Sequence, residues 1–317
     1  MLLRLLIILF LLPVFLSAQE SDTVPLVRSV HVAYENDLLA ATFDTTTDYY
    51  YTGGTLIELN FRWLEKNPAA KLLVKLPHGR NESFGMTYGH FAFTPTSIIS
   101  DSILDGDRPF SGILCIGINR VSCNVQKHWR LTSGLGVGII GPASFSYETQ
   151  KFIHAHTNNP EPLGWQYQVK NDLYLNYALK LEKGLLVKKA IEVIGYGIAN
   201  TGTVYTNAAA GIKIRTGKMQ PYFTAPAYSD GILFWVYASG ECKAVGYDAT
   251  LQGGLLNTGS IYSIDNADVR RGVFIGKAGA VIAYHKWRLE YFNAFLTPEF
   301  SGGLTHLWGH FGIQYIF

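Results

Sequence analysis

Two short polar runs near the start of the chain carry oxygen-bearing side chains of the kind that bind hard cations. The first, at positions 34–37, reads Tyr-Glu-Asn-Asp, and the second, at positions 47–54, reads Thr-Asp-Tyr-Tyr-Tyr-Thr-Gly-Gly. Calcium takes carboxylate, amide and carbonyl oxygens as ligands, whereas an Asn-Asp pair also favours a simple turn. The residues alone therefore leave two interpretations, a calcium-type site and a turn.

Two histidines, His154 and His156, offer a second kind of chemistry. In an extended segment their spacing places both on one face, which would suit zinc. A catalytic zinc site needs a third ligand, however, and no further His, Cys or Glu cluster at motif spacing supplies it. One imidazole could instead be a general base, because histidine titrates near neutral pH. A polar loop histidine without a chemical role is the third interpretation.

A third polar motif, at positions 106–112, contains Asp107 and Arg108 and leads into a predicted strand. Arginine binds phosphate through two hydrogen bonds, so this pair could hold an anionic head group or form a structural ion pair beside a turn. The sequence contains no Gly-x-Ser-x-Gly elbow, phosphate-binding loop or dinucleotide fingerprint. Ordinary serine-hydrolase and nucleotide chemistry are therefore disfavoured.

The elements that position these motifs are predicted to be strands, because apolar and polar residues alternate along much of the chain. In the last segment, one face carries Gly309, Phe311, Ile313, Tyr315 and Phe317. Alternating segments of this kind lie at 29–39, 52–64, 81–95, 111–123, 128–141, 164–184, 188–202, 204–217, 232–246, 270–285, 287–299 and 307–317. Charged residues share one face of several segments, which suits a barrel whose polar side lines the interior and whose apolar side meets lipid.

These patterns predict an all-β fold, a transmembrane antiparallel β-barrel of about 12 strands of the outer-membrane type. An even number of strands is expected of such barrels, and a final strand that ends on an aromatic residue, Phe317, resembles theirs. With both termini on the periplasmic side, the segments 39–51, 96–110 and 142–163 fall on the extracellular side. The three polar motifs gather there.

The start of the chain and its composition indicate the domain organisation and exclude some kinds of partner and site. Residues 1–18 predict a cleaved signal peptide, with a basic start, an apolar run and small residues at the expected cleavage site. Residues 19–317 are then expected to form a single barrel domain. The net charge of +2 and the scattered basic residues do not indicate nucleic-acid binding. The three cysteines fit neither a disulfide framework nor a zinc ribbon.

Taken in order, the motifs resemble the outer-membrane lipid A 3′-O-deacylase family (LpxR type). The segments that carry the resemblance are 35–37, 47–54, 106–110, 141–142, 150–154, 164–168 and 250–253. The resemblance covers essentially the whole mature chain. It implies a twelve-stranded barrel of the bacterial outer membrane that hydrolyses the ester of the 3′ acyloxyacyl chain of lipid A, part of lipopolysaccharide in the outer leaflet, with calcium as cofactor.

The same resemblance implies roles for individual residues. His154 would be the base that deprotonates a water, and Asn36, Asp37 and Thr52 would surround the cation and the oxyanion, with Asn36 and Asp37 as metal ligands. A cation held in this way would stabilise the oxyanion as a Lewis acid, and no acyl-enzyme is needed. The residues expected to bind substrate are Arg108, Asp107, Gln168 and Trp165.

The chain departs from the family at two places. Between Ala92 and Asp107 it has no lysine, where a family member has one. Pro160, followed by Glu161, stands where that member has an acidic residue six positions after the base. The first departure bears on head-group binding, and the second on the surroundings of the base.

Two alternatives to a lipid A deacylase stay open. A non-enzymatic barrel, either a pore or a structural protein, would require the segment 142–163 to plug the lumen and His154 to be incidental. An outer-membrane phospholipase with a Ser-His pair would use Ser111, Ser144 or Ser146 as its nucleophile.

Overall fold

The computed structural model describes residues 27–40, 49–61, 63–77, 79, 81–224 and 229–317. The expected signal peptide, and Thr47 and Asp48 of the second polar run, lie outside these residues.

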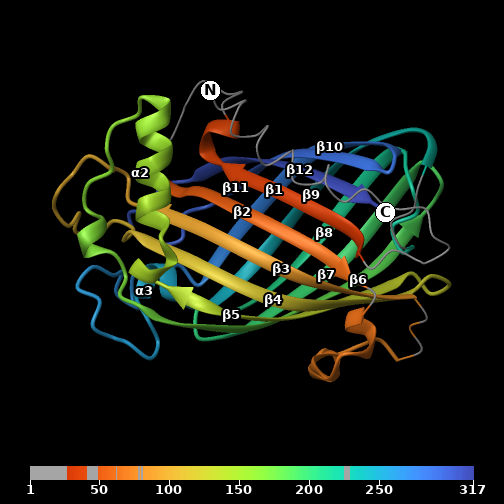
Figure 1. Ribbon diagram of the computed structural model, residues 1–317, viewed down its shortest axis with the longest axis horizontal. Coiled ribbons are helices and arrows are strands. Elements are labelled where there is room, and N and C mark those ends of the chain that lie inside the picture. The colour runs from red at the N-terminus through yellow and green to blue at the C-terminus, as the bar shows by residue number, and fades with distance from the viewer. Residues whose placement is uncertain (1–26, 41–48, 62, 78, 80, 225–228) are drawn as a thin grey trace.

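Twelve antiparallel strands form a closed barrel, in which each strand pairs with its neighbours in sequence and β1 pairs with β12 (Figure 1). The strands are β1 (Val27–Asn36), β2 (Tyr50–Phe61), β3 (Asn81–Thr94), β4 (Ser111–Asn124), β5 (Trp129–Ile140), β6 (Asp172–Val187), β7 (Ile191–Gly202), β8 (Tyr205–Lys218), β9 (Ser229–Asp248), β10 (Gly272–His285), β11 (Trp287–Leu296) and β12 (His306–Ile316). The expected fold class and strand number are confirmed.

The alternation of side chains separates an apolar outer wall from a polar interior. Along β8, Ile212 and Ile214 are exposed on the outer wall. Arg215, the residue after Ile214, points into the barrel and is buried, and its Nε donates to Oε2 of Glu192 at 2.6 Å. Because lipid tails cannot hydrogen-bond, charged groups lie in the interior and aliphatic groups face outward.

The longer connections gather at one end of the barrel. They are 37–49, 95–110, 141–171, 249–271 and 297–305. The opposite end holds the C-terminus (Figure 1), the short turns 125–128 and 188–190, and the longer connections 62–80 and 219–228. Long extracellular loops and mostly short periplasmic turns are typical of outer-membrane barrels. The first end is therefore assigned to the extracellular side, at the left of Figure 1.

Helices occur only as short elements within the described ranges. They are α2 (Ser146–Thr157), α3 (Ala249–Gln252) and the 3-10 helices η2 (Asp37–Ala40), η3 (Trp63–Lys66), η4 (Pro68–Leu72), η5 (Pro142–Ser144) and η6 (Trp165–Tyr167). In this part of the chain, no helix combines the length and the apolar character needed to cross a bilayer.

The sequence-based boundaries differ from the structure mainly at the extracellular ends. The segment expected at 29–39 stops at Asn36, because η2 follows it at once. The segment expected at 164–184 becomes a strand only at Asp172, because Gly164 adopts a left-handed φ of 89° and η6 follows.

The segment 142–163 contains a helix rather than an extended loop. Residues two apart in a helix lie on different sides, so His154 is buried whereas His156 is exposed. The expectation that the two histidines share a face is therefore wrong, and a zinc pair loses its basis.

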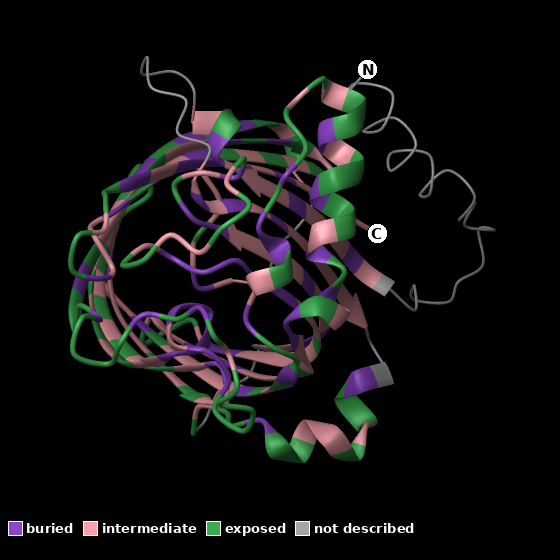
Figure 2. Cartoon of the chain, turned by 90° about the vertical axis from the view of Figure 1, so that its left-hand side faces the viewer, coloured by how far each residue is buried: buried purple, intermediate pink, exposed green. Residues whose placement is uncertain are grey.

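The extracellular mouth is filled by side chains from several loops. Tyr50, Leu251, Ile264, Val269 and Phe300 form one buried apolar cluster there. Figure 2 looks onto this end and shows buried loop segments crossing the opening inside the ring of strands, with α2 beside the wall. The pore hypothesis requires the segment 142–163 to plug the lumen, but its helix α2 lies beside the wall and not inside the ring of strands.

Candidate active site at the extracellular rim

The two polar runs meet at the extracellular end of the β1–β2 hairpin. Nδ2 of Asn36 donates to the main-chain oxygen of Thr52 at 2.5 Å, and Oδ1 of Asn36 accepts the N–H of Leu38 at 2.8 Å. Asp37 begins η2, is only 4% exposed, and its Oδ1 accepts the same N–H at 2.8 Å. The structure therefore brings the predicted residues Asn36, Asp37 and Thr52 together.

A β-bulge gives Thr52 its position. The register between β2 and β3 shifts between Tyr51 and Gly53, and bulges of this kind re-aim side chains beside functional sites. Oγ1 of Thr52 lies 3.0 Å from Oγ1 of Thr94, and both threonines are buried. Thr94 was not anticipated, because a single threonine at a strand end carries no motif signal.

The side chain of Asn36 points out of the barrel, because that of the preceding residue, Glu35, points into it. Glu35 points into the barrel, where its carboxylate accepts a hydrogen bond from the Tyr51 hydroxyl at 2.8 Å and lies 2.8 Å from Nδ1 of His310. Successive residues of a strand face opposite sides. Asn36 therefore faces the outer wall, which in a membrane barrel is the lipid side.

His154 lies on a buried stripe of α2 that it shares with Ser146 and Gln150, at four-residue spacing. Its Nδ1 is 2.6 Å from the main-chain oxygen of Pro160. Because a carbonyl oxygen only accepts, Nδ1 carries the proton and Nε2 presents its lone pair. Among the described residues, none forms a hydrogen bond with Nε2.

The end of α2 brings Pro160 to the imidazole. Asn158 adopts a left-handed conformation with φ of 57°, and its N–H donates to the main-chain oxygen of His154. The N–H of Asn159 donates to the same oxygen at 3.1 Å. The chain therefore turns back over the last turn of the helix, and the next carbonyl reaches the ring.

Side chains at the start and the middle of α2 fix the helix to the rim. Oγ of Ser146 donates to the main-chain oxygen of Phe91 at 3.2 Å and lies 3.1 Å from Nε2 of His90. In the middle of the helix, Oε1 of Gln150 accepts the indole N–H of Trp165 at 2.7 Å. Trp165 is 2% exposed, so it supports the helix from within.

Strand β3 links the two halves of the site. Its residues His90 and Phe91 hold the start of α2, and its last residue, Thr94, contacts Thr52. No hydrogen bond in the described part of the chain joins His154 directly to Asn36, Asp37 or Thr52. The predicted catalytic residues thus occupy one rim in two groups that share a strand.

The expected substrate-binding residues mostly have structural partners. Arg108 is 1% exposed; its guanidinium donates to Glu299 at 2.5 Å and to Oγ1 of Thr250 at 2.6 Å. Asp107 instead accepts the N–H and the hydroxyl of Thr96, at 2.8 and 2.6 Å. The contacts favour the structural ion pair over head-group binding by Arg108, although the partner is Glu299 and not Asp107.

The ion pair also sets the protonation of Glu299. Burial alone would raise the pKa of this carboxyl, but the attraction of the Arg108 guanidinium holds the pKa below its ordinary value. The carboxylate therefore stays charged in the mouth of the barrel at neutral pH.

Gln168, the last of the expected substrate-binding residues, lies just after η6. Its main-chain N–H donates to the carbonyl of Trp165 at 3.1 Å. Its Oε1 is buried and accepts no hydrogen bond from the described residues.

The three serines considered as nucleophiles are all buried. Ser111, Ser144 and Ser146 are at most 1% exposed. Ser146 has a histidine neighbour, but that neighbour is His90, and its hydroxyl donates to a main-chain carbonyl. These contacts explain Ser146 as an anchor of α2.

The donor set at the rim is of the type that calcium accepts. Among the residues described, no group of three or more His, Cys, Asp or Glu side chains could hold a metal. From the described residues of this rim, a cation would meet the carboxylate of Asp37 together with neutral oxygens of Asn36 and Thr52. Such a set suits a hard cation and not zinc, which prefers nitrogen and sulfur.

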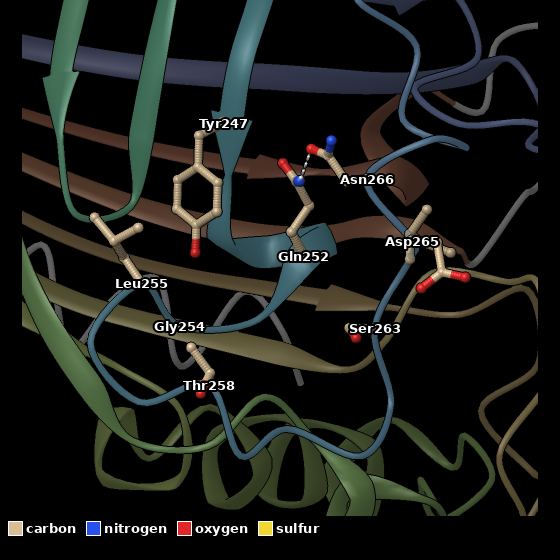
Figure 3. Close-up of a pocket in the computed structure, with 9 residues that line it drawn as sticks. Tyr247, Gln252, Gly254, Leu255, Thr258, Ser263, Asp265 and Asn266 are labelled. Atoms are coloured by element: carbon tan, nitrogen blue, oxygen red, sulfur yellow. Dashed lines mark hydrogen bonds between the residues drawn. The ribbon is translucent and has the colours of Figure 1, made fainter.

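A pocket of about 260 Å³ lies elsewhere at the extracellular end (Figure 3). Its lining comes from the end of β9, from α3 and from the loop that follows, and includes Tyr247, Leu255 and Asp265. Gln252 donates to Asn266 across one side of it at 3.0 Å. None of the predicted site residues lines this pocket.

Comparison with known proteins gives a consistent picture. The family model described as "Outer membrane protein LpxR" matches residues 3–317. Among solved structures, the chain is similar to LpxR from Salmonella typhimurium, with 18% identity and a TM-score of 0.75, covering 91% of this chain and 100% of that chain.

More distant similarities are to the β domain of the Bordetella autotransporter BrkA (12% identity, TM-score 0.44, 92% of this chain and 100% of that chain) and to the NanC porin (8% identity, TM-score 0.39, 92% and 100%). No curated protein sequence matches the chain significantly. Since the family model spans nearly all of the sequence, the chain belongs to the LpxR family of outer-membrane proteins.

Proposed function

We propose that this protein is an ester hydrolase of the bacterial outer membrane that removes the 3′-linked acyloxyacyl chain of lipid A, with calcium as cofactor. Membership of the LpxR family and the barrel fold support an outer-membrane lipid as substrate. The observation that carries the chemistry is His154, whose Nδ1–H is held by the Pro160 carbonyl and whose Nε2 is left to accept a proton.

In the proposed reaction, Nε2 of His154 takes a proton from a water molecule. The water oxygen attacks the ester carbonyl carbon, and the bond to the sugar oxygen then breaks. The imidazolium returns its proton to that leaving oxygen, so the base is regenerated. The Pro160 carbonyl, which accepts the Nδ1–H, orients the ring.

The rim residues would hold the cation. Asp37 supplies the carboxylate, and Asn36 and Thr52 supply neutral oxygens. When bound, calcium supplies Lewis acidity that offsets the negative charge on the carbonyl oxygen. Asn36 also ties the ends of β1 and β2 together through Thr52, so it fixes where Asp37 starts η2.

The outward direction of Asn36 supports a membrane-embedded substrate. A lipid in the outer leaflet could approach this face sideways, without entering the lumen. The buried clusters that fill the mouth of the barrel agree with that route.

The test is mass spectrometry of lipid A from a Gram-negative host that expresses the wild type, His154→Ala or His156→Ala. His156 is the matched control, because it lies on the same helix but is exposed and bonds only within the helix, to the carbonyl of Phe152. Outer-membrane insertion is confirmed for all three.

The 3′ acyloxyacyl mass should be lost with the wild type and His156→Ala and retained with His154→Ala. Unchanged lipid A with every variant, in the presence of calcium, would reject this substrate.

A further inference from the structure

The connection between β2 and β3 is unusual for a periplasmic turn, because it contains two short helices and lies outside the barrel. Residues 63–77, here called the periplasmic shelf, comprise η3, η4 and the extended residues that follow. Figure 2 shows these helices beyond the ring of strands, and Figure 1 places them at the end opposite α2.

The shelf is docked on the outer wall by hydrogen bonds to its backbone. The hydroxyl of Tyr177 donates to the carbonyl of Leu72 at 3.0 Å and accepts the N–H of Val74 at 3.1 Å. Oγ of Ser133 donates to the carbonyl of Val74 at 2.8 Å, and Arg120 donates to the carbonyl of Leu73 at 3.2 Å. The contacts come from β4, β5 and β6, so the shelf spans three strands.

The side chains that make these bonds face outward. Tyr177 shares the parity of the exposed Leu175 on β6, Ser133 that of the exposed Val137 on β5, and Arg120 that of the exposed Ile116 on β4. Without the shelf, the three polar groups would lie at the lipid boundary, where unpaired polar groups are costly.

Apolar packing adds to the docking. Leu64 and Leu73 of the shelf are buried in a cluster with Phe84 of β3. The shelf therefore presents a fixed outer surface.

This outer surface is both apolar and basic. Leu72 and Val74 are 59% and 50% exposed. Lys66, Lys71 and Lys75 are exposed on the same segment. The nearby Glu65 is engaged by Arg28, at 2.7 Å. Glu82 is shared between Arg120, at 2.5 Å, and Lys75, at 4.0 Å. Lys66 and Lys71 have no acidic partner among the described residues, so positive charge is left to face the surroundings.

We propose that the periplasmic shelf binds anionic phospholipids of the periplasmic leaflet. Lys66, Lys71 and Lys75 would contact the phosphates, while Leu72 and Val74 enter the upper acyl region. Exposed aliphatic side chains flanked by lysines on a segment fixed at the bilayer edge are what interfacial lipid binding requires. The proposal is independent of the deacylase chemistry, which lies at the opposite end of the barrel.

The experiment uses the full barrel, refolded in detergent micelles and titrated with dioleoyl-phosphatidylglycerol or dioleoyl-phosphatidylcholine. Native mass spectrometry counts the lipids retained. The test variant is K66Q/K71Q/K75Q. The matched control is K127Q/K188Q/K189Q, which removes three exposed lysines from the other periplasmic turns 125–128 and 188–190. Heat-dependent migration on gels confirms that each variant is folded.

The wild type and the control should retain phosphatidylglycerol at least about tenfold more strongly than the shelf variant does, since each lysine near an anionic lipid surface contributes about 1 kcal/mol. Phosphatidylcholine should be retained weakly and equally by all three. Retention of phosphatidylglycerol by the shelf variant at the wild-type level would overturn the proposal. So would an equal loss in the control, since that would assign the effect to overall charge.

Discussion

Nδ1 of His154 lies 2.6 Å from the carbonyl oxygen of Pro160. The position six residues after the base is thus used through its backbone, and not through a carboxylate side chain. Glu161, the adjacent acid, is turned away and pairs with Lys151 at 2.6 Å in an exposed ion pair. A carbonyl orients the ring as a carboxylate would, but it carries only a partial charge.

The relationship predicts which substitutions near the base are tolerated. Glu161→Gln and Pro160→Ala should each keep kcat/KM within about twofold, because neither removes the carbonyl that accepts the Nδ1–H. His154→Gln should lower kcat by about 10²–10⁴-fold, the usual contribution of a general base. Steady-state hydrolysis of lipid A by the purified barrel measures all three. A loss in Glu161→Gln as large as that in His154→Gln would show that the acid serves the base after all.

Replacement of Asp37 by Asn should weaken calcium activation. The change removes the carboxylate at the rim and keeps its shape, so the calcium concentration for half-maximal activity should rise by at least about tenfold. Asp105→Asn is the control, because Asp105 is an exposed acid of another extracellular loop. A calcium titration of hydrolysis distinguishes the two, and an unchanged midpoint in Asp37→Asn would remove Asp37 from the cation site.

Ser146→Ala should remain active. The hydroxyl is buried and anchors α2 to β3, so its loss should cost stability of about 1–2 kcal/mol and little activity. A fluorophosphonate probe should not label the wild-type barrel. Labelling that disappears in Ser146→Ala, together with loss of hydrolysis, would revive the Ser-His phospholipase.

Stability in acid should depend on Glu299. Its folded-state pKa lies below the ordinary value of 4.5, so its ion pair with Arg108 stabilises the fold above about pH 4.5. That contribution is lost as the pH falls through the lower, folded-state pKa. The wild type should therefore lose stability below pH 4.5 more steeply than Glu299→Gln does.

At pH 7, Glu299→Gln should itself be destabilised by about 3 kcal/mol, because it leaves the buried Arg108 without a charged partner. Urea unfolding at several pH values tests both statements. The control is Glu148→Gln, which changes an exposed acid on α2. If the free energy of unfolding changed with pH in the same way in the wild type and in Glu299→Gln, the predicted contribution of Glu299 to acid stability would be wrong.

The barrel could be predicted from the sequence because a strand in a membrane has one face in lipid and one in the lumen. Because of that constraint, apolar and polar residues alternate along each strand, as in Ile212 and Ile214 on either side of Lys213. Alternation did not predict the structure of the extracellular segments, since the helix α2 is held in place by contacts with residues outside it. Trp165 and Phe91, which hold Gln150 and Ser146, are remote in sequence and leave no periodic signal.

The sequence predicted which residue types form the candidate site, but only part of how they are arranged. Asn36, Asp37 and Thr52 were expected to converge, and they do so because a hairpin joins them. The partner of Arg108 could not be foreseen, because Glu299 lies 191 residues away. The Pro160 carbonyl was equally hidden, since every residue has a carbonyl and sequence does not say which one a ring will meet.

The contact between Arg108 and Glu299 has a consequence for biogenesis. Arg108 belongs to the second extracellular loop, whereas Glu299 belongs to the last one, and Thr250 comes from the loop between β9 and β10. The buried guanidinium therefore finds both partners only after the final hairpin has been added. A barrel arrested before that step would keep an uncompensated charge at its mouth. The C-terminal hairpin must therefore be in place before the charge of Arg108 is neutralised at the rim.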